Sequence, residues 1–408
     1  MTSKLATAAR PPLGETSRAA APLDFDTNRL DELLDEAGID VLIASSKHNI
    51  QYLLGGYRFF FFGGHDALGI SRYLPLFLYF RGQPERATYI GNSMESWEEA
   101  NGTIHAPEID ASTSGTEDAM RRALRHLSGG TARPKRIGVE RAFLPADAES
   151  VLRSGMPSVE IVDALLPLER LRAVKTKAEL NLVREGSIRV VDSMLAVFAS
   201  HGPGHTKKEL AEALRREEVQ RGLDFEYCLI ACGASHNRAP SDQIWREGEV
   251  LNLDSGGKYH GYIGDLARMG ILGEPDQELI DLLAEVEEIQ QATRRPIRHG
   301  AMGSEVYKAA EAAIARAPHR KEIHFAAHGV GLITHEAPRL SDRAPVPYPA
   351  EGAMKPLEAG MVISIETAIH HPRRGFIKLE DTVAVTQTGC DGYGDHGRGW
   401  NRGGVATG

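Results

Sequence analysis

Residues 251–268 read LNLDSGGKYHGYIGDLAR and carry two aspartates, Asp254 and Asp265, on either side of a glycine-bearing stretch. The apolar run before Asp254 predicts a short buried strand. Ser255 to Lys258 predicts a turn, and Tyr259 to Leu266 predicts the returning strand. Such a hairpin would bring the two carboxylates together, where they would repel each other unless one is protonated or a cation lies between them. Alternatively, Asp254 caps a turn and Asp265 lies on a solvated face.

The composition is that of a globular protein, with 408 residues, 42% hydrophobic and 25% charged residues, and a net charge of -9. This acidic balance, with no basic block, argues against a nucleic-acid partner. Three cysteines are too few for a disulfide framework and indicate a reducing, cytoplasmic compartment. The sequence has no run of eighteen apolar residues, so we expect no membrane span.

The length and the pattern of elements predict two main domains. Residues 1–24, rich in Ala, Pro, Thr and Ser, are expected to form a disordered leader. Strand and helix patterns alternate over residues 25–171, which predicts an α/β domain. The second domain is expected to span residues 172–390, beginning with a long amphipathic helix. The Gly-rich residues 391–408 are expected to be a tail or a lid over a pocket.

A run of aromatic residues lies early in the first domain, where Tyr57 and Arg58 precede Phe59 to Phe62. Because a strand alternates its faces, four consecutive phenylalanines cannot all point into one core unless both faces are covered. Core packing is one interpretation. An interface or a ligand lid, with Arg58 beside exposed aromatic rings, is the other.

Histidines and glutamates in the second domain follow a pattern that suggests a site. Residues 323–338, IHFAAHGVGLITHEAP, contain His324, His328 and His335, with glycines that would let other groups approach a histidine ring closely. An apolar strand pattern then ends on Glu366, and Glu380 lies inside another. A glutamate within an apolar strand needs a partner, which a salt bridge or a metal ion would supply.

Together these segments offer four carboxylates and one imidazole, all in or near strands. Hydrolytic sites with two metal ions need bridging carboxylates that hold the ions roughly 3.5–4 Å apart. Such ligands suit two divalent ions; manganese fits the carboxylate excess best, and iron, cobalt or zinc also fit. The candidate metal ligands are Asp254, Asp265, His328, Glu366 and Glu380.

The order and spacing of these residues resemble the creatinase/prolidase/aminopeptidase P superfamily. Its pattern is matched by Asp254, by Asp265 followed by Arg268, by HGVGLITHEAP from His328, and by two late glutamates. The segment RAVKTKAEL at the junction is also similar to the start of the family's catalytic domain. The resemblance implies an α/β N-terminal domain followed by an α+β catalytic domain of the "pita-bread" fold.

The resemblance also implies roles for single residues. One metal ion would be held by Asp254 and Asp265, the other by Asp265, His328 and Glu366, with Glu380 bridging. Glu366 would act as general base on a bridging water, and His335 and His324 would contact the substrate. Three further residues would contact the substrate. His236 lies one residue off the usual position of a further histidine and is otherwise an ordinary loop histidine. The other two are Tyr262 and Lys378, and Lys378 replaces an arginine of the family.

Two further features bear on the substrate. Glu366 is followed by Thr367-Ala368 where the peptidase branch has Pro-Gly. The N-terminal stretch NIQYLLGGYRFFFFGG is similar to the creatinase-like branch, in which this loop enters the neighbouring subunit's site. By that analogy Arg58 and Phe60 would contact substrate across a homodimer.

Three functions remain open at this point. The first, favoured by family frequency, is a metal-dependent hydrolase of Xaa-Pro dipeptidase or aminopeptidase type, acting on short peptides. The second is a small-molecule enzyme on the same fold: an amide or amidine hydrolase of creatinase or ectoine hydrolase type, or a lyase of the dimethylsulfoniopropionate type. The third is a binding protein without catalysis, which a complete ligand set argues against.

Overall fold

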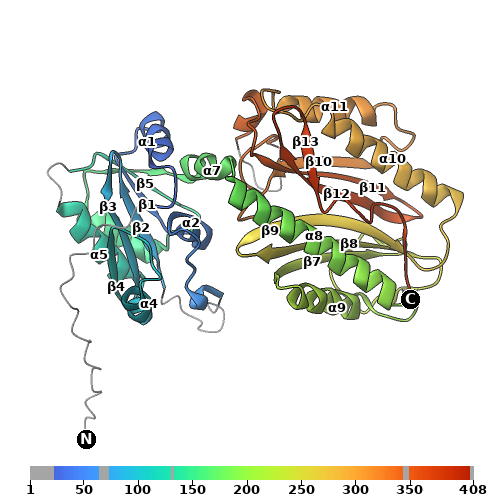
Figure 1. Ribbon diagram of the computed structural model, residues 1–408, viewed down its shortest axis with the longest axis horizontal. Helices are drawn as coiled ribbons and strands as arrows, with labels where there is room; N and C mark the ends of the chain where they lie inside the picture. The colour runs from blue at the N-terminus through green and yellow to red at the C-terminus, as the bar shows by residue number, and fades with distance from the viewer. Residues whose placement is uncertain (1–22, 64–72, 130–132, 343–348, 405–408) are drawn as a thin grey trace, which may run out of the picture. The chain divides into compact units, whose positions relative to one another are not determined.

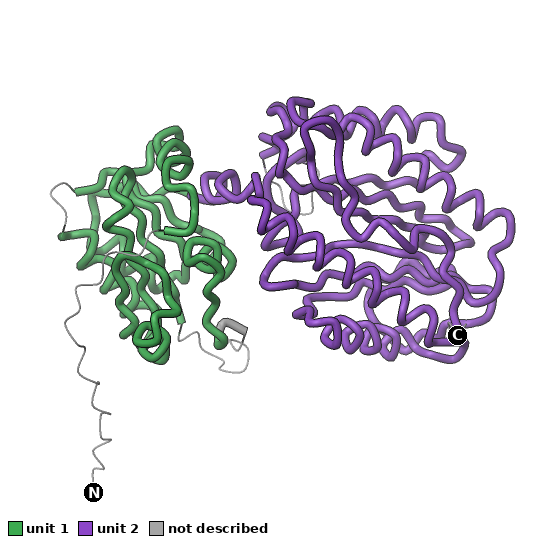
Figure 2. Tube along the Cα trace, in the orientation of Figure 1, with its two compact units in different colours: residues 1–163 green, residues 164–408 purple. Residues whose placement is uncertain are grey.

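The structure, a computed structural model, divides into two compact units, residues 1–163 and 164–408 (Figure 2). It describes residues 23–63, 73–129, 133–342 and 349–404. Nearly all of the expected leader therefore lies outside the described residues. The boundary expected at residue 172 lies near the end of helix α7 (Leu165–Ala173), which belongs to the second unit; it stays a prediction.

The first unit is the expected α/β domain. Its six-stranded sheet has the order β4-β3-β2-β1-β5-β6 and mixes parallel with antiparallel pairs. The strands are β1 (Val41–Ala44), β2 (Leu76–Phe80), β3 (Gln83–Asn92), β4 (Glu108–Thr113), β5 (Arg136–Val139) and β6 (Glu160–Asp163). The helices are α1 (Thr27–Glu36), α2 (Lys47–Leu53), α4 (Ser96–Asn101), α5 (Thr116–Ser128) and α6 (Ala146–Gly155), with short 3-10 turns η1 (Phe60–Gly63) and η2 (Ser93–Glu95).

The core of this unit lies on both faces of the sheet. Met120 of α5 and Leu152 of α6 share one buried cluster with Leu76 and Leu78 of β2. Phe77, which alternates with these leucines, faces the other way and contacts the ring of Phe25 just before α1. The strands are therefore apolar on successive residues, as expected for a sheet covered on both sides.

The phenylalanine run forms a helical turn instead of a strand. Phe59 is buried, whereas Phe60, the first residue of η1, is 72% exposed. Their ring centroids lie 4.9 Å apart, and Phe59 also contacts Tyr73. Both interpretations of the run therefore hold in part, because one ring anchors the turn in the core and the next is presented on the surface. The side chain of Phe62 lies outside the described residues.

The second unit is built on an eight-stranded sheet whose central path runs β10-β11-β12-β9-β8-β7. The strands are β7 (Asp224–Cys232), β8 (Val250–Tyr259), β9 (Tyr262–Ile271), β10 (Ile323–Gly329), β11 (Val362–His371), β12 (Gly375–Val385), β13 (Cys390–Tyr393) and β14 (Asn401–Arg402). The remaining helices are α8 (Lys177–Ser200), α9 (Lys207–Gln220), α10 (Gln277–Arg294) and α11 (Ser304–Ile314), with the 3-10 turn η3 (Glu351–Met354).

Helices cover one face of this sheet, and the predicted metal ligands lie on the other. Leu253 of β8 and Leu266 of β9 pack with Met194 of α8, which crosses both strands (Figure 1). Ile377 and Leu379 of β12 pack with α10. Because side chains alternate along a strand, Asp254, Asp265 and Glu380, each adjacent to one of these apolar residues, point to the other face. The chain thus has the pita-bread fold that the resemblance implied.

The turn predicted at Ser255–Lys258 is wrong. Those residues continue β8, and the hairpin turns instead at His260 and Gly261, whose φ angles are 48° and 88°. The two glycines of the predicted turn serve close packing. A Cβ on Gly256 would lie 2.3 Å from the ring of Tyr227, and one on Gly257 would lie 2.5 Å from Glu218.

The Gly-rich C-terminal segment contributes two short strands to the sheet, the second ending at Arg402, so its described residues do not form a loose tail. β13 pairs with β12, and β14 pairs with β9. Buried Arg268 donates to the carbonyl oxygens of Gly394 and His396, both at 2.7 Å. Trp400 donates to Leu279 of α10. Within the described residues, none of the helices has the length and apolar character needed to cross a membrane.

Candidate metal centre

One row of residues across the sheet carries three of the predicted ligands. Asp254 lies opposite Ala267, Ala267 opposite Glu380, and Glu380 opposite Glu366. Asp265 lies two residues before Ala267 on the same face, and His328 is two residues beyond Ala326, the partner of Glu366. Strand register alone therefore places all five predicted ligands on one face.

Three of these side chains have the geometry of a metal site. Ligand atoms of Asp265, His328 and Glu380 lie within 4.8 Å of one another, and all three residues are buried. Nε2 of His328 is 3.9 Å from Oε1 of Glu380 and 3.7 Å from Oε1 of Glu366. This buried nitrogen has no hydrogen-bond partner within the described part of the chain. A buried polar atom without a partner is costly, so its position at the centre of three carboxylates indicates a cation there.

The ionisation of these groups points to the same need. Burial and the repulsion of Asp254 raise the pKa of Asp265, and burial and the repulsion of Asp265 raise the pKa of Glu380. Burial lowers the pKa of His328, which keeps the imidazole in the neutral form that binds metals. Two of the carboxylates are thus strained by mutual repulsion that a cation between them would relieve.

Lys378 lies inside the carboxylate cluster. Its ammonium is 2.6 Å from Oδ2 of Asp254, 2.6 Å from Oε2 of Glu366 and 2.8 Å from Oε2 of Glu380. Burial alone would raise the pKa of Glu366, but the Lys378 ammonium and the neighbouring histidine outweigh it and lower that pKa to about 2. The lysine predicted to touch substrate therefore contacts three of the predicted metal ligands.

Two further residues of this site were not singled out from the sequence. Tyr227 of β7 donates its hydroxyl proton to Asp265, across the space that Gly256 leaves open. Arg238, in the loop after β7, donates to the same oxygen of Asp254 as Lys378 does. Neither has a local sequence signal, because each contact depends on the pairing of β7 with β8.

The predicted catalytic histidines lie on both sides of the carboxylate row. His335 stacks on His328 with ring centroids 3.9 Å apart, and burial, followed by the proximity of the His328 ring, lowers the pKa of His335 to about 4. His324 and His236 are both exposed and lie close to His370, with ring centroids 4.3 and 5.3 Å from it. This histidine edge, made of His236, His324 and His370, begins in the row next to Glu366, where His324 pairs with Ala368 and Ala368 with Lys378.

Three predicted substrate contacts are not in this cluster. Tyr262 lies on the helix-covered face, three residues before Asp265, and its hydroxyl donates to Glu179 of α8 at 2.5 Å. That contact assigns Tyr262 to anchoring α8, so we do not propose it as a substrate contact. Arg58 and Phe60 belong to the first unit, where both are exposed.

Other residues of the recognised motif support the scaffold. Glu336, in the HEAP segment, forms buried ion pairs with Arg172 at 3.2 Å and Lys175 at 2.9 Å, where the second unit begins. Arg268 is also buried and pairs with Asp381 at 3.2 Å. A motif can therefore hold residues that position the site without entering it.

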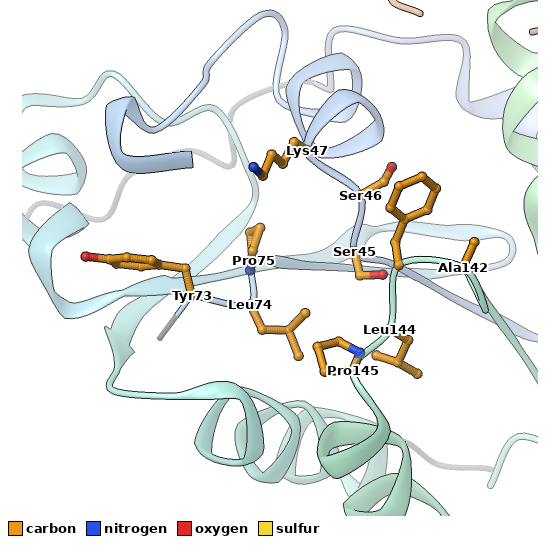
Figure 3. Close-up of a pocket in the computed structure, with 10 residues that line it drawn as sticks. Ser45, Ser46, Lys47, Tyr73, Leu74, Pro75, Ala142, Leu144 and Pro145 are labelled. Carbon is orange, nitrogen blue, oxygen red and sulfur yellow. The ribbon is translucent and has the colours of Figure 1, made fainter. Parts of the chain in front are cut away.

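The first unit contains a separate cavity of about 380 Å³ (Figure 3). Its wall includes Ser45, Lys47, Tyr73 and Leu144 and none of the predicted ligands. The backbone N–H groups of Ser45 and Ser46 donate to Glu140 at 2.6 and 2.8 Å, so they are already paired. The acidic face of the second unit is therefore the stronger candidate for catalysis.

Comparison with protein families identifies the second unit. Residues 181–387 match the model of metallopeptidase family M24, and residues 27–174 match the Creatinase/Prolidase N-terminal domain. The chain belongs to metallopeptidase family M24. It shares 24% identity over 367 residues with an uncharacterized peptidase, YqhT, of Bacillus subtilis, which covers 88% of this chain and 95% of that protein. A Xaa-Pro dipeptidase of Pyrococcus furiosus is 26% identical over 229 residues, or 55% of this chain and 63% of that protein.

Solved structures share the fold of this M24 chain over nearly its whole length. The Xaa-Pro dipeptidase from Bacillus anthracis aligns with a TM-score of 0.74 at 21% identity, covering 91% of this chain and 97% of that one. The X-Pro aminopeptidase from Thermotoga maritima aligns with a TM-score of 0.73 at 20% identity, covering 92% and 99%. At these identities the likeness shows the fold alone.

Membership of family M24 implies divalent metal ions, in a dinuclear centre. The residues of this chain fit an ion beside Asp265, His328 and Glu380, since these supply two oxygens and an orphaned imidazole nitrogen at ligand spacing. Within the same cluster, the ammonium of Lys378 lies among Asp254, Glu366 and Glu380. The M24 centre of this chain is therefore a cluster of carboxylates that already contains two cationic side chains, Lys378 and Arg238.

Proposed function

We propose that this M24 metallopeptidase is a metal-dependent peptidase of the Xaa-Pro dipeptidase or aminopeptidase type. The observation that carries the proposal is the single face on which Asp254, Asp265, Glu366, Glu380 and His328 meet. Support also comes from the Xaa-Pro dipeptidase and X-Pro aminopeptidase that this chain resembles. A pure binding module would not need a buried set of acidic ligands that repel one another.

Asp265, His328 and Glu380 would hold the metal ion. What a divalent cation bound there supplies is a lowered pKa for water and polarisation of the carbonyl group at the scissile bond. Mn²⁺ suits the excess of carboxylate ligands, and Fe, Co²⁺ or Zn²⁺ also suit this donor set. Ser364 fixes Glu380 by donating to its Oε1 at 2.8 Å, and Tyr227 fixes Asp265. Such contacts orient ligands and are part of a metal site.

Glu366 is the proposed general base. Its side chain is 23% exposed, whereas that of Glu380 is 3% exposed, so Glu366 is the more accessible of the two glutamates. The ammonium of Lys378 holds its Oε2, while Oε1 faces His328. Its low pKa keeps Glu366 ionised at neutral pH, which is the form that a general base needs.

The histidines would handle the peptide. His335, whose ring is stacked on His328, is neutral at pH 7 and able to donate one hydrogen bond to the oxyanion that develops during attack. The histidine edge lies one row beyond Glu366, where a short peptide would extend past the cleavage point. The nitrogen of an Xaa–Pro bond carries no hydrogen, so an enzyme recognises the proline by the shape of its ring and not by an N–H donor. The histidine rings of this edge offer a surface against which such a ring would pack.

The test is a panel of Xaa-Pro dipeptides and Xaa-Pro-Xaa tripeptides, offered to metal-stripped enzyme reloaded with Mn²⁺. Release of proline from dipeptides would establish a dipeptidase, and release of the N-terminal residue from tripeptides would establish an aminopeptidase. Xaa-Ala peptides of the same length serve as the matched control. No turnover of any peptide by protein that holds its metal would overturn the proposal and favour small amidino, ureido or sulfonium compounds as substrates.

We further propose a homodimer in which the first unit of one chain contributes to the partner's site. Phe60, the first residue of η1, is 72% exposed, and the exposed Arg58 lies two residues before it, next to buried Phe59. A large exposed aromatic residue next to an arginine is typical of an interface or a ligand contact. Arg58 would then bind the substrate carboxylate, for which its planar guanidinium is suited.

A further inference from the structure

We infer that the ammonium of Lys378 takes the place of one of the two metal ions, so that this chain binds a single divalent cation, held by Asp265, His328 and Glu380. The inference rests on the proposed metal centre and concerns its stoichiometry. It follows from the positions of two cationic side chains of this chain, Lys378 and Arg238.

The contacts of Lys378 are those of a coordinated cation. Its ammonium has three N–H donors, and three carboxylates lie at 2.6, 2.6 and 2.8 Å. The ammonium donates a hydrogen bond to Asp254, and it forms ion pairs with the two glutamates at similar distances. The side chain is only 3% exposed, and Lys378 lies on the same strand as Glu380, two residues away and on the same face. The ammonium is therefore held in the cluster by the strand that also supplies Glu380.

Asp254 is contacted by two cationic side chains. Its Oδ2 accepts from Lys378 and also from Arg238. A carboxylate oxygen that already receives two cationic donors has little negative charge left to attract a metal ion. Asp254 is thus a ligand of protein cations, although its place in the sequence pattern matches that of a metal ligand.

The balance of charge also fits one ion. Asp254, Asp265, Glu366 and Glu380 bring four negative charges when ionised, and Lys378 and Arg238 remove two. One divalent cation neutralises the remainder. Two divalent cations would leave the buried cluster with a net positive charge before any other anion enters, and uncompensated buried charge is costly.

The position that remains has the dimensions of a metal site. Metal bonds to nitrogen and oxygen ligands are about 2.0–2.2 Å long, which sets ligand atoms about 3–4 Å apart. The 3.9 Å from His328 Nε2 to Glu380 Oε1 fits this spacing. The orphaned Nε2 of His328 marks this position and not the one that Lys378 fills.

The first experiment counts metal ions. Purified protein is stripped with a chelator, loaded with excess Mn²⁺, dialysed, and analysed by elemental mass spectrometry and by electron paramagnetic resonance. We expect one Mn²⁺ per chain and the spectrum of an isolated ion. Two Mn²⁺ per chain, with the spectrum of a spin-coupled pair, would overturn the inference, and so would the absence of bound Mn²⁺.

Variants of Lys378 supply the second measurement. Lys378→Met removes the charge and keeps the length, so we expect a second Mn²⁺ to enter and the count to rise to two per chain. Lys378→Arg keeps the charge and should keep the count at one. Lys355→Met, a lysine on an exposed turn paired with Glu351, is the matched control with no change. A count of one in Lys378→Met that is folded by circular dichroism would contradict the inference.

Metal counting and peptide turnover separate this inference from the proposed function. A chain that binds two Mn²⁺ and cleaves Xaa-Pro peptides would retain the function and overturn the inference. A chain that binds one Mn²⁺ but cleaves none of the peptides would support the inference and overturn the function.

Discussion

Glu366 and Glu380 lie directly opposite each other on β11 and β12, with Ser364 bonded to Glu380 and Lys378 bonded to both glutamates. Like charges placed opposite each other destabilise a sheet. The repulsion between the two glutamates is therefore offset by positive charge, in part from Lys378 and, by our proposal, from a metal ion. Stability and function make opposite demands on this pair.

Replacing Glu380 with Gln tests that opposition. The amide keeps the volume and removes a buried charge, so we expect bound Mn²⁺ to fall to a small fraction of the wild-type amount. Unfolding by urea in the presence of a chelator should show a metal-free variant at least as stable as the metal-free wild type. Glu351→Gln, on the exposed turn η3, is the control and should change neither quantity. Full metal content in Glu380→Gln would remove Glu380 from the ligand set.

A second prediction concerns Gly256, which the sequence pattern assigned to a turn and the structure assigns to β8. A methyl group there would lie 2.3 Å from the ring of Tyr227, which reaches over Gly256 to Asp265. Gly256→Ala should therefore displace Tyr227 and cost about 1–3 kcal/mol of the free energy of unfolding, as overpacking does. Metal affinity should also fall, because Asp265 loses its donor.

Gly389→Ala is the matched control for this substitution, since a methyl group at Gly389 would meet nothing within 4 Å. Urea unfolding and Mn²⁺ titration of the two variants check the prediction. Equal stability of the two variants would show that Tyr227 does not depend on the space above Gly256.

A third prediction concerns pH. Burial raises the pKa of Glu218 from 4.5 to about 7, opposed by its bond from Ser255. The Ser255 hydroxyl has a single proton and lies 2.7 Å from both Glu218 Oε1 and the carbonyl oxygen of Tyr227. A protonated Glu218 would resolve this by donating to Ser255, which then donates to Tyr227.

The sign of the pH effect follows from the raised pKa. Between about pH 4.5 and 7 the folded state binds this proton and the unfolded state does not, so the stabilisation is complete below pH 4.5 and is lost as the pH rises through 7. Glu218→Gln mimics the protonated form. Relative to wild type it should gain little at pH 5 and up to on the order of 3 kcal/mol at pH 8.

Urea unfolding at the two pH values measures this difference, with Glu311→Gln on the exposed face of α11 as the control. An effect of Glu218→Gln that is the same at pH 5 and pH 8 would show that Glu218 is ionised in the folded protein throughout.

The fold and the order of the acidic residues could be predicted from the sequence because both depend on short sequence patterns. Apolar strands, the long amphipathic helix at the start of the second domain, and a glycine-flanked His328 are visible in short windows. The position of the hairpin turn was not predictable in this way. Gly256 and Gly257 have the composition of a turn, and only the packing of Tyr227 and Glu218 shows why they lie in a strand.

The contacts within the site were harder to predict because they link distant segments. Nothing near Glu336 in the sequence indicates that it pairs with Lys175, which lies 161 positions away. Arg238 reaches Asp254 only because β7 pairs with β8, and Lys378 meets Asp254 only because β12 pairs with β9, which pairs with β8. The sequence spacing identified the candidate metal ligands. The cationic side chains that contact these ligands could be found only from the register of the sheet.

The last prediction concerns the proposed action of Arg58 across a homodimer. We expect sedimentation at micromolar concentration to show a dimer and Arg58→Ala to lower kcat/KM for Xaa-Pro peptides, because a carboxylate contact is lost. To decide whether the contact crosses the dimer, Arg58→Ala and Glu380→Gln chains carrying different tags are co-expressed and purified through both tags. Each such dimer pairs one chain of each kind.

If Arg58 acts on the partner's site, the Arg58→Ala chain keeps an intact metal centre and receives a native Arg58 from its partner, so one of the two sites is complete. The mixed dimer should then show about half of the wild-type activity, well above either parent dimer. If Arg58 acts within its own chain, each site of the mixed dimer lacks one essential group and activity stays at the parental level. A strict monomer, or full activity of the Arg58→Ala parent, would rule out the contact itself.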